Sequence, residues 1–126
     1  MIELITKKLH DTLGVTVYAE TVPQGLNTPS ISVFAKELKV LGECEGWILC
    51  KAEFRAVVRE LPAELVADAL GFVTDREGQV YRGEEIYATA DEGQTEVYVT
   101  FRYRARVTET IEAAPLMEVM TQNTEV

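Results

Sequence analysis

The sequence predicts an α+β fold: a mainly antiparallel β-sheet of two hairpins plus a short first strand, with two helices packed on one face. Two patterns lead to this prediction. Apolar and polar residues alternate over residues 96–107 and again over 47–60, which is the period of a strand with one buried face. Apolar residues recur at a spacing of about 3.6 over residues 2–13 and 61–73, which is typical of a surface helix.

The first helix is expected at residues 2–13, where four apolar residues fall on one side: Ile2, Ile5, Leu9 and Leu13. Gly14 is expected to end it, as glycine commonly does. Residues 15–20 then predict a short strand. Residues 21–30 are rich in proline, glycine and asparagine and therefore predict a loop. Loops of this length in a small domain are often functional.

Two long strands are expected next, at residues 31–41 and 47–60, with a hairpin tip between Gly42 and Gly46. The strand at 47–60 alternates as cleanly as the strand at 96–107. Both are therefore expected among the central strands of the sheet.

A second helix is expected to open at residues 61–64, with Pro62 in its first turn, and to run to about residue 73. Its apolar side would be formed by Leu65, Ala69, Phe72 and Val73. Residues 75–78 predict a turn. Residues 79–90 and 95–107 predict a second hairpin, which turns at residues 91–93.

The 126 residues are enough for one domain with its own core, and the net charge is −9. Residues 109–126 contain four acids and no base, whereas residues 1–108 contain 17 acids and 12 bases, a net charge of −5. We therefore expect one domain at 1–108 and a separate acidic tail or arm at 109–126. The acidic balance argues against a nucleic-acid surface built from bulk charge, and nothing resembles a signal peptide or a membrane span.

The sequence predicts no enzyme, no metal site and no cofactor. His10 is the single histidine and has no recognisable partner, so a structural role is expected. Cys44 and Cys50 lack the spacing of a redox pair or a zinc half-site, which favours reduced thiols in a cytosolic protein. Cys50 lies on the apolar side of its strand and is expected in the core.

Three arginines, Arg102, Arg104 and Arg106, occupy the polar side of the last strand. One interpretation is a solvated face paired to acids on an adjoining strand, for example Glu85 or Glu53, where an exposed pair contributes less than about 1 kcal/mol. The other is a surface between subunits, where arginine is enriched.

The tail also has two interpretations. It could be a frayed end, or an arm that lays its apolar residues on a neighbouring chain. The residues expected to form such an arm are Leu116, Met117, Val119 and Met120.

Residues 17–30, VYAETVPQGLNTPS, follow a short amphipathic helix, and this segment resembles the tail terminator proteins of phages, defective prophages and contractile bacteriocins of Gram-positive bacteria. In that family a first strand containing tyrosine leads through a Gln-Gly loop to a proline and the second strand. The order of elements over residues 1–107 is also similar to the terminator fold. The serines Ser30 and Ser32, after the proline, and the long acidic tail depart from the family pattern.

The resemblance implies a non-enzymatic structural protein that forms a six-fold ring. Such a ring would cap the tail tube, stop its polymerisation and join it to the neck, collar or sheath protein. The protein would assemble in the bacterial cytoplasm and then belong to the tail or tail-like particle.

Within this interpretation, the subunit contacts are expected at Arg102, Arg104, Arg106, Glu53 and Glu85. The tube or neck contacts are expected in the loop and at the first hairpin tip: Pro23, Gln24, Gly25, Leu26, Asn27, Pro29, Glu43 and Glu45. Two alternatives stay open: a head-completion or neck ring protein and, in a different class, an acidic DNA-mimic inhibitor.

Overall fold

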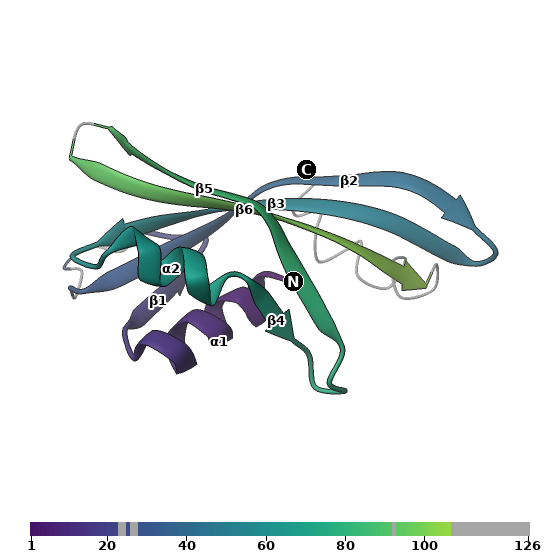
Figure 1. Ribbon diagram of the computed structural model, residues 1–126, viewed down its shortest axis with the longest axis horizontal. Helices are drawn as coiled ribbons and strands as arrows, with labels where there is room; N and C mark the ends of the chain where they lie inside the picture. The colour runs from purple at the N-terminus through teal and green to yellow at the C-terminus, as the bar shows by residue number, and fades with distance from the viewer. Residues whose placement is uncertain (23–24, 26–27, 92, 107–126) are drawn as a thin grey trace. The chain divides into compact units, whose positions relative to one another are not determined.

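The computed structural model describes residues 1–22, 25, 28–91 and 93–106. Helices and strands follow one another in the order α1 (Ile2–Leu13), β1 (Thr16–Ala19), β2 (Ser30–Cys44), β3 (Trp47–Arg59), α2 (Ala63–Ala69), β4 (Phe72–Thr74), β5 (Val80–Asp91) and β6 (Gln94–Arg106) (Figure 1). Two compact units divide the chain. The first, called the body here, comprises residues 1–38 and 51–102, and the second comprises residues 39–50 and 103–126.

The sheet has the strand order β1-β2-β3-β6-β5-β4 and is mostly antiparallel, with β1 running parallel to β2. The predicted α+β class, with two helices and a mostly antiparallel sheet, is confirmed. So is the prediction that the strands now seen as β3 and β6 are central, since each has two strands on one side and three on the other. Their alternation reflects one face that packs in the core and one that is more exposed.

The helix predicted at residues 2–13 is confirmed, with the same bounds. α1 buries Ile5 and Leu9 completely or nearly so, and Gly14 ends it in the left-handed conformation at φ 68°. α1 packs against α2, β1 and β4, and both helices lie on the same side of the sheet in Figure 1.

The core of the body is formed by alternate residues of the central strands. Phe54 of β3 and Phe101 of β6 meet edge to face, with their ring centroids 6.3 Å apart. Phe101 is fully buried, which by itself is worth roughly 1.5–3 kcal/mol of hydrophobic stabilisation. Val97 and Val99 continue the buried side of β6.

The second helix is shorter than predicted. α2 begins after Pro62, which is extended at ψ 134° and precedes the helix instead of lying in its first turn, and ends at Ala69. Phe72 and Val73 belong to β4, a strand that the sequence pattern did not reveal. The prediction that these residues continue the helix is therefore wrong, because β4 pairs with β5 at Phe72–Arg82 and Val73–Tyr81.

The pairing with β5 also explains which side chains are buried. Val73 is buried, whereas Phe72 is 51% exposed on the other face of its strand. Leu65, predicted on the apolar side of the helix, is 46% exposed.

The predicted tip between Gly42 and Gly46 is also narrower than expected. β2 continues to Cys44, and only Glu45 and Gly46 connect it to β3. Both have positive φ, 51° and 85°, which is the conformation of a type I′ hairpin turn. This turn matches the twist of the two strands, so pairing continues to its edge. The predicted turn at residues 75–78 lies between β4 and β5.

Candidate functional site

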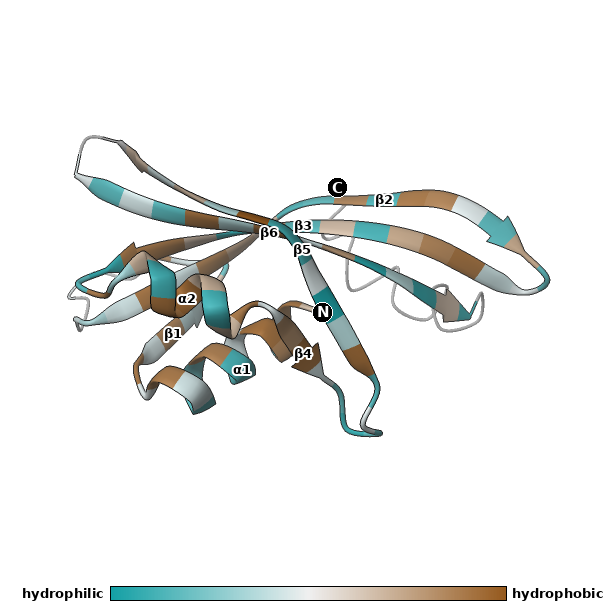
Figure 2. Ribbon diagram, in the orientation of Figure 1, coloured by the Kyte–Doolittle hydropathy of each residue, from teal (hydrophilic) through white to brown (hydrophobic). Residues whose placement is uncertain are grey.

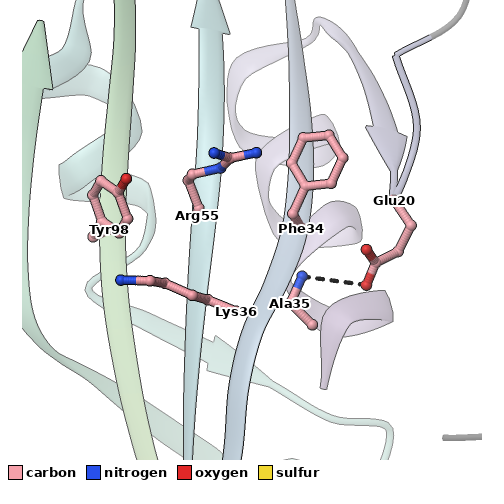
Figure 3. A pocket seen from close by; sticks show the side chains of 6 residues that line it. All are labelled: Glu20, Phe34, Ala35, Lys36, Arg55 and Tyr98. Carbon is pink, nitrogen blue, oxygen red and sulfur yellow. Dashed lines mark hydrogen bonds between the residues drawn. The ribbon is translucent and has the colours of Figure 1, made fainter. Parts of the chain in front are cut away.

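A shallow hollow of about 390 Å³ lies on the sheet of the body, lined by Glu20, Phe34, Ala35, Lys36, Arg55 and Tyr98 (Figure 3). Its floor is formed by neighbouring strands β2, β3 and β6. In Figure 3 the side chain of Lys36 crosses β3 toward Tyr98, while the guanidinium of Arg55 reaches toward Phe34. We refer to it as the Tyr98 hollow.

Both cations of the Tyr98 hollow are already engaged. Lys36 Nζ lies 5.1 Å from the centre of the Tyr98 ring and 3.7 Å from a carboxylate oxygen of Glu53. The Arg55 guanidinium lies 4.9 Å from the centre of the Phe34 ring, and its Nη1 lies 3.8 Å from Glu96. Such a surface of rings and loosely paired charges suits contact with a protein better than capture of a small anion.

Glu96 is held in its charged form by the groups around it. The Tyr98 hydroxyl donates a hydrogen bond of 2.7 Å to Glu96 Oε1, and Gln94 Nε2 donates one of 2.7 Å to Oε2. The bond from Tyr98 is the main cause that lowers the pKa of Glu96, and Gln94 and Arg55 add to it against the opposing effect of burial. The same bond raises the pKa of Tyr98.

The loop that carries the predicted tube contacts is fastened where it joins the sheet. The backbone N–H of Glu20, a residue at φ 61°, donates to the Val33 carbonyl (2.8 Å), and the Glu20 carboxylate accepts a hydrogen bond from the Ala35 N–H at 3.2 Å. At the other end, Arg59 donates to the hydroxyls of Ser30 (3.1 Å) and Ser32 (2.9 Å), both fully buried. The two serines that depart from the family pattern are thus part of a clamp between β2 and β3.

The arginine stripe predicted from the sequence divides into two parts. Arg102, in the body, pairs with Glu84 and also lies 3.7 Å from Glu85. A bulge in β5 between Glu84 and Tyr87, with Glu85 at φ 52°, explains how two consecutive glutamates reach one arginine. The expected pairing with Glu85 is present, whereas Glu53 pairs with Lys36 instead of an arginine of the stripe.

Arg104 and Arg106, in the second unit, both lie over the indole of Trp47. Their guanidinium carbons lie 5.4 and 5.0 Å from the centre of the Trp47 ring. Arg104 forms no ion pair with any residue that the structure describes. A tryptophan flanked by two arginines is a composition typical of protein interfaces.

Apolar side chains extend this cluster along the hairpin. The two-residue turn places Cys44 opposite Trp47, so alternation puts Leu49 and Val40 on the same face as the indole. Val40 is 57% and Leu49 43% exposed, and Figure 2 shows apolar segments along these parts of β2 and β3. We call the surface formed by Val40, Trp47, Leu49, Arg104 and Arg106 the Trp47 face.

The other predicted contact residues are placed only in part. Glu43 and Glu45 are exposed at the first hairpin, and Gly25 and Pro29 are exposed in the loop. Pro23, Gln24, Leu26 and Asn27 lie outside the described residues, as do the predicted arm residues Leu116, Met117, Val119 and Met120.

The sequence interpretation missed Trp47, Tyr98 and Arg55. A signal for Trp47 existed: it is the single tryptophan of the chain and it directly follows the hairpin glycine. The ring contacts of Tyr98 and Arg55 depend on the strand order and had no local signal.

His10 and Cys50 have the positions expected of structural residues. The His10 ring lies with Nδ1 3.0 Å from the Val15 carbonyl, so that nitrogen donates the bond that joins the end of α1 to the following chain. Cys50 is 4% exposed, and burial raises the pKa of its thiol. In the described ranges, no group of three or more His, Cys, Asp or Glu side chains could hold a metal ion, and no helix is long and apolar enough to span a bilayer.

No protein-family model matches the chain, and no curated protein matches it.

Proposed function

We propose that this protein is a phage-type tail terminator: a structural protein that assembles as a ring on the end of a tail tube, stops its growth and presents a surface to the neck or collar. The six-fold symmetry and the tube as partner come from the resemblance of residues 17–30 to that family. The structure contributes support for one requirement of the proposal, a surface that binds other protein subunits.

The observation that carries the proposal is the exposed outer part of the first hairpin. Every residue of β2 from Ala35 to Cys44 is exposed. This strand has 15 residues and its partner β3 has 13, whereas strands in globular proteins usually have about 5–6. A paired segment with both faces exposed gains little from burial within its own chain.

The side chains on this segment favour association. Leu41 is 45% exposed on the opposite face from Val40, so apolar residues lie on both sides of the hairpin. Such side chains become buried when another subunit packs against them, and Trp47 with its two arginines supplies the kind of residues that dominate binding energy. A ring needs a head-to-tail contact between two different surfaces, and the Trp47 face supplies one of them.

The clamped ends of the long loop support the second part of the proposal. Glu20 and Arg59 fix the two points at which residues 21–29 leave and rejoin the sheet. Fixed ends place the two attachment points of this loop identically in each copy of a ring, which favours a repeated contact with a tube.

The experiment that tests the proposal combines native mass with recruitment to tubes. We expect light scattering over a range of concentration and salt to detect a hexamer, or a monomer that purified tail tubes collect at one end only. Tubes assembled with the protein should stop at a defined length.

Three results would contradict the proposal: a monomer that tubes do not bind, binding along the whole tube, or tube length unchanged by the protein. A ring that binds the portal side of a head and not the tube would instead identify a neck protein. A compact monomer that co-purifies with a basic DNA-binding enzyme would identify an inhibitor.

A further inference from the structure

We infer that the Trp47 face binds the acidic C-terminal segment, residues 109–126, of a second copy of this chain. This inference rests on the proposed ring, because it supplies the second surface of the subunit contact. It goes further by naming the segment that occupies the face and the chemistry by which it is recognised.

The first argument is charge. Residues 109–126 contain Glu109, Glu112, Glu118 and Glu125 and no basic residue. The Trp47 face presents the guanidinium of Arg104, which has no ionic partner among the described residues, and beside it that of Arg106. Carboxylates that pair with an arginine stacked on an indole leave the stacking intact, since the guanidinium edge and its plane bind different groups.

The second argument is apolar matching. The acids of the segment are interspersed with apolar residues, namely Ile111, Leu116, Met117, Val119 and Met120. The face offers Val40 and Leu49, which are 57% and 43% exposed, beside a tryptophan that is 36% exposed. Methionine and other flexible apolar side chains adapt well to such a shallow surface.

The third argument is reach and direction. The 20 residues that follow Arg106 can span up to about 70 Å when extended, which is ample to reach a neighbouring subunit. The segment leaves β6 beside Trp47, at the turn end of the hairpin, since the Arg106 guanidinium lies 5.0 Å from the indole. Leu49 and Val40 lie farther from the hairpin turn than Trp47 does. A segment of the same chain would therefore have to turn back directly after Arg106 to cover them. A segment from a neighbour can approach along the whole face.

The native cysteine at position 44 makes the inference directly testable. Cys44 is exposed and lies opposite Trp47, next to the face, while Cys50 is buried. One preparation carries Cys44→Ser and Ala114→Cys, and the other is the wild-type full-length protein. The two are mixed, oxidised briefly and digested, and the disulfide between Cys44 and position 114 is quantified by mass spectrometry. In this mixture it can form only between two copies.

We expect this disulfide at several times the level seen with a control preparation that carries Cys44→Ser and Gln79→Cys, an exposed position outside the face. Adding Glu112→Gln and Glu118→Gln to the arm-bearing preparation should reduce it severalfold. A mixed disulfide no more abundant than the control overturns the inference. So does an Ala114→Cys single variant that forms only an internal disulfide on dilution, because this places the segment on its own chain.

The native mass of the wild-type protein separates failure of this inference from failure of the proposed ring. If the protein is a hexamer and the disulfide does not form, only the arm is wrong. If no oligomer forms with or without tubes, the proposed function is wrong as well.

Discussion

At the scale of a single residue, Tyr98 combines a ring stack, a cation–π contact and a hydrogen bond on the sheet surface. Its ring stacks on Tyr87, with centroids 4.9 Å apart and planes 8° from parallel, and it lies beneath the ammonium group of Lys36. Its hydroxyl binds Glu96, which in turn faces Arg55. Removing this hydroxyl should therefore change the stability of the fold through its effect on the charged form of Glu96.

Replacing Tyr98 with Phe should destabilise the fold in a way that depends on pH. The hydroxyl lowers the pKa of Glu96 in the folded protein, so the interaction stabilises the fold above the unfolded pKa, about 4.3 for glutamate. Its contribution is lost as the pH falls through the folded pKa, because both states then carry a protonated carboxyl. The difference in unfolding free energy between wild type and Tyr98→Phe should be about 1 kcal/mol at pH 7 and shrink below pH 4.

Urea unfolding at pH 7 and pH 3 measures this difference. Tyr87→Phe is the matched control, since that exposed tyrosine keeps its ring stacking and its hydroxyl has no partner among the described residues. The control should show little change at either pH. A Tyr98→Phe effect of the same size at both pH values would mean that the hydroxyl acts without the charge of Glu96.

At the scale of elements, Gly83 fixes the junction between α2, β4 and β5. A β-carbon at this position would lie 2.0 Å from the carbonyl oxygen of Leu70 and 3.0 Å from Val99. The Gly83 N–H donates to the Gly71 carbonyl at 2.9 Å, which holds β5 against the end of the helix. This close approach is possible only without a side chain.

Gly83→Ala should therefore destabilise the protein by about 1–3 kcal/mol, the usual cost of forcing a group into a packed site. Gly42→Ala is the matched control in β2, because a β-carbon there meets nothing within 4 Å. It should be neutral or stabilising by up to about 1 kcal/mol, as expected when alanine replaces a strand glycine. Equal stability of the two variants would show that the junction can shift to accept a side chain.

This junction also explains how far the elements could be predicted. α1, β3 and β6 have long apolar patterns that fit one period only, so the type of each element could be predicted from its own sequence. The same patterns predicted the central placement of β3 and β6 in the sheet. Residues 71–74 could not be read in that way. Val73 fits the buried side of a helix and of a strand equally well, and only pairing with Tyr81, eight residues further on, decides between them.

The candidate site was predictable to a smaller extent for a similar reason. The stripe of Arg102, Arg104 and Arg106 is visible in the sequence as alternation, but its partners are set by distant features. A bulge in β5 brings Glu84 and Glu85 to the first arginine. A two-residue turn between β2 and β3 makes Trp47 the first residue of β3, where its indole lies beside Arg104 and Arg106. Bulges and exact turn lengths are poorly marked by hydrophobic pattern.

At the scale of the whole molecule, a net charge of −9 must be reconciled with the proposed association into a ring. Copies with this charge repel one another at long range, so the contact needs local attraction to overcome it. The Trp47 face is suited to this task, because it is cationic and apolar within an acidic chain. Association through it should therefore be sensitive to reversal of a single charge there.

Arg104→Glu should leave the fold intact and weaken association by at least about tenfold, equivalent to about 1.4 kcal/mol. The variant loses the cation over the indole and repels acidic segments of neighbouring copies. Arg76→Glu is the matched control, since it makes the same change in net charge at an exposed turn. Light scattering at equal concentration and salt compares the two, and circular dichroism checks that both are folded. Because the change in total charge is identical, equal weakening would assign the effect to overall repulsion, whereas loss of the ring in Arg104→Glu alone would assign it to the Trp47 face.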